Sequence, residues 1–381
     1  MRDYAIVAGV AAVAAYALTP PIRAYVLRIG ALDVPTDRKI HHAPTPTMGG
    51  VAIYLGFVLA FVAAALLPSQ RSAFRFTEVF GLVCGGFIPV ALGIADDRLE
   101  LSVAPKLAGQ FFAAGFLYFS GVQLNHFWLP GIGALSLSPD LSAIVTILWV
   151  VLLMNAVNWI DGLDGLAAGL SAIAAGALFI YAVRLPEVFL GPDPLAPLAA
   201  AAIVGACVGF LPHNFHPAKI IMGDTGAMTL GYLLAGATIS MIGRTGAQGA
   251  AIGRVALPMV FTPLVFLAIP ITNLLLAVVR RTVRGQNPFS HHDMEHLHNR
   301  MMDIGHSHRR AVLIMYGWAL LLASGLVLAG TMPWGRFVLA FAIAGGSVAL
   351  LTVAPRFRGR GRHPRDPGSP ASVADRPSQP V

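Results

Sequence analysis

The stretch IVTILWVVLLMNAVNWIDGLDGLAAG, residues 144–169, indicates how this chain folds. Its apolar part ends at Met154. Four polar residues follow directly: Asn155, Asn158, Asp161 and Asp164. If the helix continues, the spacing of three places the first three on one helical face, and Gly162 and Gly165 permit a turn behind them. The pattern predicts a membrane helix that ends in a polar site, the alternative being a cap between two helices.

The composition of the whole chain extends this interpretation. Of the 381 residues, 56% are hydrophobic and 12% are charged, and the mean hydropathy is +0.71. A soluble protein carries about 25% charged residues, and a backbone in lipid must satisfy its own hydrogen bonds. We predict an all-α integral membrane protein with about eleven transmembrane helices. The predicted spans are residues 4–27, 49–67, 78–95, 104–120, 140–157, 165–183, 197–211, 225–242, 255–277, 311–329 and 334–353.

Local sequence refines these spans and divides the chain. Three prolines, Pro258, Pro263 and Pro270, predict a kinked or broken ninth helix. We expect residues 1–354 to form one membrane domain and residues 355–381, rich in Pro, Arg and Ser, to form a disordered basic tail. The segment 121–139 is expected to form a hairpin or a surface helix. The two cysteines fall in apolar spans and are expected to be packing residues rather than a disulfide.

The basic residues set the expected orientation. Eighteen of the 26 Lys and Arg residues fall in the tail and in the loops on the same side of the membrane as the C-terminus. By the positive-inside rule the C-terminus and the polar loops are cytoplasmic, and the N-terminus lies outside a plasma membrane. The net charge of +8 suits an anionic inner leaflet, although the positive-inside bias alone explains it equally well.

Two polar segments on that side contain candidate ligands for a metal ion or a phosphate. Asp96 and Asp97 end the third span, with Lys106 nearby. Adjacent carboxylates at a membrane face require a cation, and Mg²⁺ binds such oxygens; an acidic pair facing water is the alternative. Further along, Asp224 could ligate a metal beside a helix N-terminus or act as a plain N-cap. Two neighbours of Asp224, Asn214 and Lys219, could contact a phosphate or, for the lysine, extend to lipid headgroups.

The segment 278–310 is the longest loop on this side and the most basic. It contains His296, His298 and Arg300 among many other histidines and arginines. The H-x-H spacing alone is weak evidence for zinc, and recognition of a diphosphate fits the mixture of His and Arg better; a basic loop on lipid is the alternative. Carboxylates for magnesium, cations for a diphosphate and a lipid-soluble reactant together indicate phosphoryl chemistry. No nucleic-acid partner is predicted.

In their order along residues 30–310, these segments resemble the polyprenyl-phosphate N-acetylhexosamine-1-phosphate transferase family. The motif D-x-P-x-x-R-K-x-H-x-x-P-T-P-T-M-G-G (Asp33–Gly50) looks like the WecA and TagO branch rather than MraY. The stretch GHSHRRAVLIMY (Gly305–Tyr316) looks like actinobacterial members, whose lipid carrier is usually decaprenyl phosphate. The resemblance implies transfer of N-acetylglucosamine-1-phosphate from UDP-N-acetylglucosamine to polyprenyl phosphate, giving polyprenyl-diphospho-N-acetylglucosamine and UMP. This would be the first membrane step of a cell-wall polysaccharide, with homodimers common among relatives.

The resemblance also implies residue roles. Asn158 and Asp224 would bind Mg²⁺, with Mn²⁺ able to substitute. Asp96 and Asp97 would lie at the lipid phosphate, and Asp161 and Asp164 would lie in the nucleotide-sugar site. The remaining substrate-binding candidates are Lys39, Lys106, Asn155, Asn214, Lys219, His296, His298 and Arg300. Because the second pKa of a phosphate monoester is near 6, we expect Asp97 to position the metal or the lipid rather than to remove a proton.

Three residues depart from the family pattern. Ala227, Asn273 and Asn299 stand where relatives usually carry Ser, Asp and His. They leave another UDP-N-acetylsugar open as the donor. A member with weak catalysis is a further alternative, and so is an ion-coupled transporter, because buried acids and broken helices also mark transporters.

Overall fold

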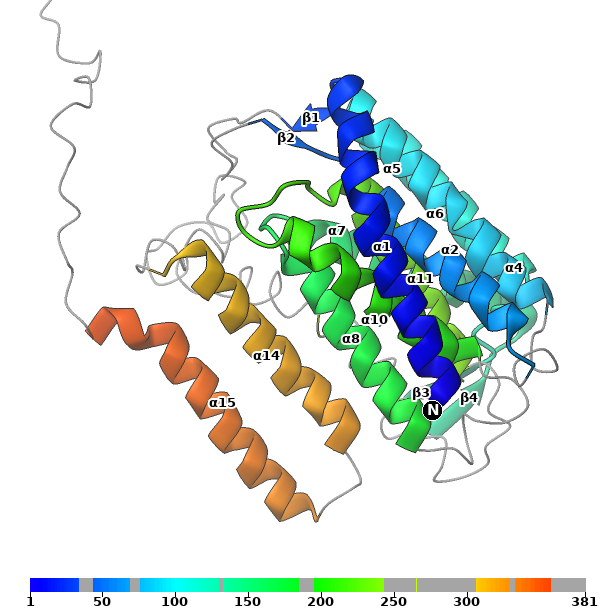
Figure 1. Cartoon of the computed structure of the whole chain (residues 1–381). Helices are drawn as coiled ribbons and strands as arrows, with labels where there is room; N and C mark the ends of the chain where they lie inside the picture. The colour runs from blue at the N-terminus through cyan, green and yellow to red at the C-terminus, as the bar shows by residue number, and fades with distance from the viewer. Residues whose placement is uncertain are drawn as a thin grey trace, which may run out of the picture.

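The computed structural model describes residues 1–33, 44–68, 76–129, 133–184, 195–242, 265, 306–328 and 333–357. This part of the chain is mostly helical (Figure 1). Its helices are α1 (Arg2–Arg28), α2 (Gly50–Leu66), α4 (Phe76–Gly85), α5 (Phe87–Leu99), α6 (Val103–Phe119), α7 (Pro139–Ile160), α8 (Leu166–Arg184), α10 (Leu195–Asn214), α11 (Gly223–Ile242), α14 (His308–Leu328) and α15 (Trp334–Phe357). The strands are β1 (Leu32–Asp33), β2 (Thr45–Pro46), β3 (His126–Leu129) and β4 (Gly133–Ser136).

The apolar segments of the sequence become these helices. Every predicted span except the ninth coincides with helix, and the third divides at Gly86 into α4 and α5. The ninth, with its three prolines, lies outside the described residues apart from position 265. Six described helices are long and apolar enough to cross a membrane: Arg2–Arg28, Thr77–Leu99, Pro139–Ile160, Leu166–Arg184, Leu195–Asn214 and Gly335–Thr352. A mostly helical membrane protein is therefore confirmed, whereas the predicted number of about eleven spans is not confirmed by the residues that the structure describes.

Two short strand pairs, one at each end of the bundle, are added to the predicted helical fold. β1 pairs antiparallel with β2, and β3 pairs antiparallel with β4. Figure 1 shows the two pairs at opposite ends of the helices. Backbone groups that leave a helix still need hydrogen-bond partners, and two short strands satisfy one another. The β3–β4 pair confirms a hairpin, rather than a surface helix, in the segment 121–139.

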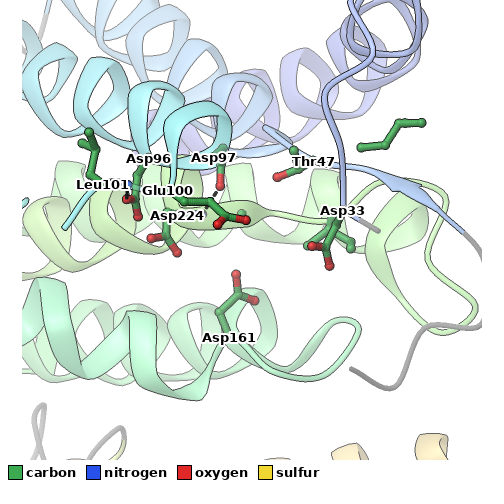
Figure 2. A pocket seen from close by; sticks show the side chains of 11 residues that line it. Asp33, Thr47, Asp96, Asp97, Glu100, Leu101, Asp161 and Asp224 are labelled. Carbon is green, nitrogen blue, oxygen red and sulfur yellow. Dashed lines mark hydrogen bonds between the residues drawn. The ribbon is translucent and has the colours of Figure 1, made fainter. Parts of the chain in front are cut away.

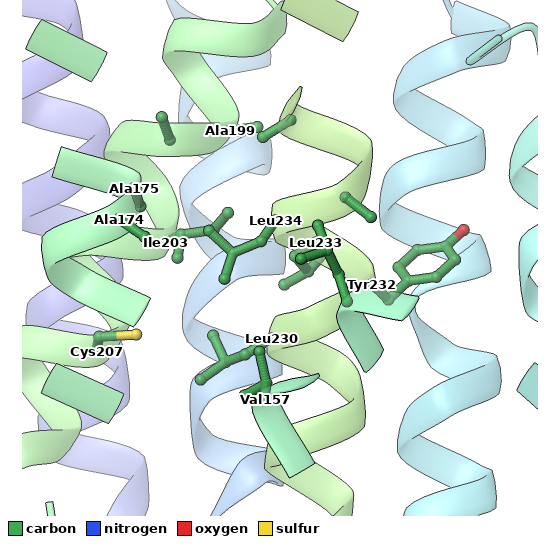
Figure 3. Close-up of a cluster of buried hydrophobic side chains, with 14 of the residues drawn as sticks. Val157, Ala174, Ala175, Ala199, Ile203, Cys207, Leu230, Tyr232, Leu233 and Leu234 are labelled. Atoms are coloured by element: carbon green, nitrogen blue, oxygen red, sulfur yellow. The ribbon is translucent and has the colours of Figure 1, made fainter. Parts of the chain in front are cut away.

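The central element is α11. Residues 225–241 are all buried, and α11 packs against α7, α5, α10, α2, α8 and α6. Figure 3 shows its leucines and Tyr232 among side chains of the neighbouring helices. Two of its threonines bond within the helix: the Thr229 hydroxyl donates to the Thr225 carbonyl at 2.6 Å, and the Thr238 hydroxyl donates to the Leu234 carbonyl at 2.7 Å. A helix enclosed by protein needs no continuous apolar surface, and α11 is not among the six described helices that are long and apolar enough to cross a membrane.

Glycines allow α11 to approach its neighbours closely. A Cβ at Gly93 of α5 would lie 2.2 Å from the Thr225 Cα, and one at Gly50 of α2 would lie 2.1 Å from the Gly226 nitrogen. No real Cβ tolerates such distances, so only glycine fits at these two crossings. The crossings bring the C-terminal end of α5 and the N-terminal end of α2 against the start of α11.

The outer helices present apolar side chains outward. α1 packs on α10 and α2, while α15 packs on α14, and Figure 1 shows this last pair to one side of the bundle. Leu339, Ile343 and Leu351 of α15 are about 60% exposed or more, as lipid-facing residues should be. Both cysteines are free thiols, Cys207 buried and Cys84 exposed, which confirms the absence of a disulfide. α15 continues to Phe357, beyond the predicted boundary at 354, and residues 358–381 lie outside the described chain.

We predict that Gly93→Ala lowers the free energy of unfolding by about 1–3 kcal/mol, because the new methyl group forces α5 away from α11. The matched control is Gly115→Ala in α6, since a Cβ there meets nothing within 4 Å. Alanine is the better helix former, so the control should be neutral or slightly stabilised. Thermal unfolding in detergent micelles measures both, and equal midpoints would contradict the close packing of α5 on α11.

Candidate active site

The polar motifs meet at one end of the bundle, called here the polar end. α5 and α7 finish there, and α6 and α11 begin there, beside the β1–β2 pair (Figure 1). A cavity of about 580 Å³ opens between them, within the range typical of small-molecule sites. Figure 2 shows its labelled side chains, several of them carboxylates. It is lined by Leu32, Asp33, Thr47, Asp96, Asp97, Glu100, Leu101, Asp161, Ile221, Gly223 and Asp224.

A lysine holds two carboxylates together at this cavity. The Lys106 Nζ donates to the Asp96 Oδ2 at 2.7 Å and also to the Asp224 Oδ2. The Asn158 Nδ2 donates to the other carboxylate oxygen of Asp224 at 2.6 Å. Two carboxylates this close repel one another unless a cation lies between them. The structure therefore brings together four residues predicted from three separate motifs, with Lys106 at their centre.

Asp97 has a different set of partners from its neighbour Asp96. Its Oδ1 accepts the Asp224 backbone N–H at 2.9 Å. Its Oδ2 accepts the Thr225 hydroxyl at 2.7 Å and the Thr225 N–H at 3.3 Å. These donors belong to the first turn of α11, where a helix favours negative charge. Asp97 thus caps α11 from another helix and fixes the backbone that carries Asp224, an arrangement that favours the positioning role expected from the sequence.

Asn155 lies one turn deeper in the bundle and braces two helices. Its Nδ2 donates to the Gln110 Oε1 at 2.6 Å and to the Val151 carbonyl at 2.8 Å. Gln110 belongs to α6 and is completely buried. This pair sets the distance between α6 and α7, and so between Lys106 and Asn158. Asn155 is not among the residues that line the cavity, although the sequence predicted it as a substrate contact.

Asp161 directly follows α7 and faces the cavity. Figure 2 shows its carboxyl group directed toward the side of the cavity that carries Asp97 and Asp224. Burial, and then the negative charges of Asp224 and Asp97, raise the pKa of Asp161 well above its ordinary value. The described residues that line the cavity include six carboxylates and no lysine or arginine. The cavity is suited to receive a cation.

Asp164 and Asn214 are not among the residues that line the cavity. They connect the loop after α7 to the segment between α10 and α11. The Asp164 Oδ2 accepts the His216 Nδ1 at 2.7 Å and the Ala218 N–H at 3.2 Å. The Asn214 Oδ1 accepts the Gly165 N–H at 3.0 Å, and its Nδ2 donates to the Ile220 carbonyl at 3.0 Å. Both side chains are buried. They hold the loop after α7 against the segment between α10 and α11.

Other predicted residues are not part of this assembly. Lys219 is exposed, and its backbone carbonyl accepts the Arg23 Nε at 2.8 Å. Of the three departures from the family pattern, Ala227 is buried within α11. The remaining predicted residues lie outside the described chain: Lys39, His296, His298, Arg300, Asn273 and Asn299.

The sequence interpretation missed several cavity residues. Asp33 and Thr47 line the cavity because the β1–β2 pair turns the chain back at the polar end. Both belong to the quoted segment Asp33–Gly50, so a signal was present without a role attached to it. Glu100 and Ile221 also line the cavity. Gln110, His216 and Tyr316 were missed because isolated polar residues carry no motif.

The donor set fits a magnesium ion. Asp96, Asp161 and Asp224 offer carboxylate oxygens near the cavity, and Mg²⁺ is usually held by one or two carboxylates together with substrate phosphates. The Lys106 ammonium, placed between Asp96 and Asp224, marks where positive charge is required. A half-turn of the Asn158 amide would present its oxygen in place of its nitrogen.

Comparison with known proteins identifies the family of the chain. The glycosyl transferase family 4 model matches residues 79–242, a range that contains Asp96, Lys106, Asn158 and Asp224. The chain is 40% identical over 332 residues to "Decaprenyl-phosphate N-acetylglucosaminephosphotransferase" of Mycobacterium tuberculosis (strain ATCC 25618 / H37Rv). That alignment covers 85% of this chain and 82% of the relative. The chain belongs to glycosyl transferase family 4.

Two further relatives show the breadth of this family. A Bacillus subtilis (strain 168) protein, "Probable undecaprenyl-phosphate N-acetylglucosaminyl 1-phosphate transferase", is 35% identical over 299 residues, which is 78% of this chain and 77% of the relative. A "Phospho-N-acetylmuramoyl-pentapeptide-transferase" of Desulforudis audaxviator (strain MP104C) is 33% identical over 311 residues, 76% of this chain and 86% of the relative. The resemblance inferred from the five motifs is confirmed.

We predict that Lys106→Gln makes the fold depend on divalent cations. Without Lys106, Asp96 and Asp224 face one another uncompensated, and the free energy of unfolding should fall by about 1–3 kcal/mol in EDTA. Added Mg²⁺ should restore more stability to this variant than to the wild type. Lys219→Gln, at an exposed lysine, is the control and should change little. A Lys106→Gln protein as stable as the wild type in EDTA would contradict the assigned role.

Proposed function

We propose that this protein transfers N-acetylglucosamine-1-phosphate from UDP-N-acetylglucosamine to polyprenyl phosphate, with decaprenyl phosphate as the preferred carrier. The observation that carries the proposal is that Asp96, Asp161 and Asp224 line one cavity at the end of a membrane bundle. Lys106 and Asn158 bond to these carboxylates. Relatives with 40% and 35% identity carry names for this transfer. The family assignment and the geometry therefore support the same chemistry.

The reaction joins two anions. A lipid-phosphate oxygen attacks the phosphorus atom that bears the sugar, and a new P–O–P bond forms. The bond from that phosphorus to the bridging oxygen of the UDP diphosphate breaks, and UMP leaves with the bond's electron pair. Since the lipid phosphate is largely dianionic at neutral pH, the main barrier is charge repulsion rather than proton removal. Magnesium, when bound, would neutralise the diphosphate and the attacking group.

The residues of the chain would divide this work. Asp224 and Asn158 would hold the metal, with Asp161 and Asp96 beside it. Lys106 would keep positive charge at the cavity, and Asp97 would hold the start of α11 so that Asp224 stays aimed. Lys39, His296, His298 and Arg300 stay predicted contacts to phosphate or sugar. Asp164 and Asn214 would shape the uridine side of the site.

The membrane placement of the site follows from its charges. Most Lys and Arg residues belong to the predicted loops on the side of the carboxylate motifs, so the polar end would be cytoplasmic. The water-soluble donor is made in the cytoplasm, whereas the lipid acceptor stays in the bilayer. A cavity at the end of the helices lets both reach the same carboxylates. The product would begin a cell-wall or surface polysaccharide.

Two alternatives differ in their support. A different UDP-N-acetylsugar is consistent with the same metal site, because the phospho-N-acetylmuramoyl-pentapeptide transferases are also relatives. Ala227, Asn273 and Asn299 motivate that alternative. An ion-coupled transporter is disfavoured, because transporter sites lie near the bilayer midplane, whereas the carboxylates that line the cavity gather where α5 and α7 end.

The deciding measurement is UMP release by purified protein supplied with UDP-N-acetylglucosamine, decaprenyl phosphate and Mg²⁺, each omitted in turn. The proposal expects UMP only when all three are present, with a polyprenyl-diphospho-sugar as the second product. Turnover of another UDP-N-acetylsugar alone would change the donor and keep the reaction. Silence with every donor would sink the proposal.

We predict that Asp224→Ala lowers kcat by at least about 10²-fold, since the position that holds the metal and its charge is lost. Asp140→Ala is the matched control. Asp140 is exposed in the first turn of α7, at the opposite end of that helix from the cavity. The control should retain wild-type turnover. Equal rates for Asp224→Ala and Asp140→Ala would remove Asp224 from the metal site.

A further inference from the structure

A second polar cluster lies where α14 begins, behind the carboxylate cavity. It consists of Asp164 from the loop after α7, His216 from the segment between α10 and α11, and His308, the first residue of α14. One oxygen or nitrogen atom from each lies within 4.8 Å of the others. Asp164 is 5% exposed and His308 is 9% exposed. Three distant parts of the chain therefore meet here, with Asp164 and His308 buried and the His216 side chain 38% exposed.

The two histidines are arranged as a stack. Their ring centroids are 4.0 Å apart and the ring planes differ by 16°. On its edge, His216 uses Nδ1 to contact the Asp164 Oδ2 at 2.7 Å. The imidazole of His216 is thus held by a carboxylate on one edge and by an aromatic ring on one face. Such a ring has little freedom to turn, so it fixes the carboxylate that it contacts.

A metal ion explains this geometry less well than a stack does. Two histidines that ligate one ion direct their nitrogen lone pairs at a common point, whereas nearly parallel rings direct them in parallel planes. The 2.7 Å separation of His216 and Asp164 is an ordinary charge-assisted hydrogen-bond length. The geometry therefore favours a cluster that orients the Asp164 carboxylate over a second metal site.

α14 is attached to the same two loops at further points. The Arg309 Nε donates to the His216 carbonyl at 2.9 Å. The Tyr316 hydroxyl donates to the Gly165 carbonyl, next to Asp164. Tyr316 also lies over Gly169, where a Cβ would be 2.0 Å from the tyrosine oxygen. These contacts run along the first turns of α14 and fasten it to the loop that carries Asp161 and Asp164.

We infer that His308 is a positioning residue for the uridine-nucleotide site: by stacking on His216 it holds the imidazole that orients the carboxylate of Asp164. The inference rests on the proposed function, in which Asp164 shapes the uridine side of the donor site. It gives α14 a role that no motif assigned. The helix that follows the predicted His296–His298 segment would also set how tightly the donor binds.

The consequence is specific to the donor. Without the stack, His216 can rotate and Asp164 loses a charge-assisted hydrogen bond, so the KM for UDP-N-acetylglucosamine should rise roughly tenfold. The KM for decaprenyl phosphate and the Mg²⁺ concentration for half-maximal rate should stay unchanged. Asp96, Lys106 and Asp224 are held by bonds that do not involve α14.

The experiment compares four variants of the full-length protein in detergent micelles. His308→Ala removes the stack, and His308→Phe keeps an aromatic ring without the imidazole nitrogens. Arg309→Ala removes the bond to the His216 carbonyl, and Arg310→Ala is the matched control at the neighbouring exposed arginine. Steady-state UMP release gives each KM and kcat, and calorimetric titration with UDP gives nucleotide affinity without turnover.

The inference expects weak donor binding in His308→Ala and Arg309→Ala, rescue in His308→Phe, and wild-type values in Arg310→Ala. If all four variants turned over substrate and had the donor KM and the UDP affinity of the wild type, the inference would be overturned. The proposed function would be unaffected. A wild type that binds UDP but releases no UMP would defeat the proposed function, and UDP affinities would still decide the inference. If the wild type bound one equivalent of zinc, and both His308→Phe and His308→Ala lost it, the cluster would be a metal site and the inference would be overturned.

Discussion

Asp97 of α5 accepts three hydrogen bonds from the first turn of α11, and the rest of the polar end depends on this contact. The first N–H groups of a helix have no partners within the helix, and a carboxylate near lipid needs donors. Each therefore satisfies the other. The contact exists because Gly93 lets α5 approach Thr225 closely. It fixes both the depth and the direction of Asp224.

From that fixed point the charges of the site are built outward. Asp224 meets Lys106 of α6 and Asn158 of α7, and the buried Gln110–Asn155 pair keeps those two helices in register one turn deeper. Asp161 then faces a cavity already rich in carboxylates, and burial, together with these charges, raises its pKa. Negative charge concentrated at a membrane surface is unstable alone. It becomes useful when the reactants are a metal ion and a diphosphate.

The segment between α10 and α11 connects this carboxylate cluster to the outer helices. Asn214 ties it to Gly165, Arg23 of α1 holds the Lys219 carbonyl, and Arg309 of α14 holds the His216 carbonyl. A segment held from several helices can carry functional groups with little freedom, as preorganised sites require. The same segment leads directly into Asp224, so the two halves of the site share one stretch of backbone.

Much of this could be predicted from the sequence, because lipid makes hydropathy an unusually direct signal of helix position. The apolar spans and the polar end followed from pattern and spacing, and the resemblance to the family implied that Asn158 and Asp224 share a metal ion. The β1–β2 pair was missed, since two-residue strands carry no periodic signal. The bond between Asn155 and Gln110 was not predicted either, because helix spacing fixes a face and not the neighbour that the face meets.

The sequence by itself determined that this is a helical membrane protein with its charged chemistry at helix ends, because burying so many carboxylates along lipid-facing helices would be prohibitive. Only the tertiary structure decided which charges meet. Asp97 became a cap and Asp96 an ion-pair partner although they are adjacent, because successive helical residues point in different directions. His216 and His308 stack although 92 positions separate them, because helix packing, which no local pattern records, places their backbones side by side.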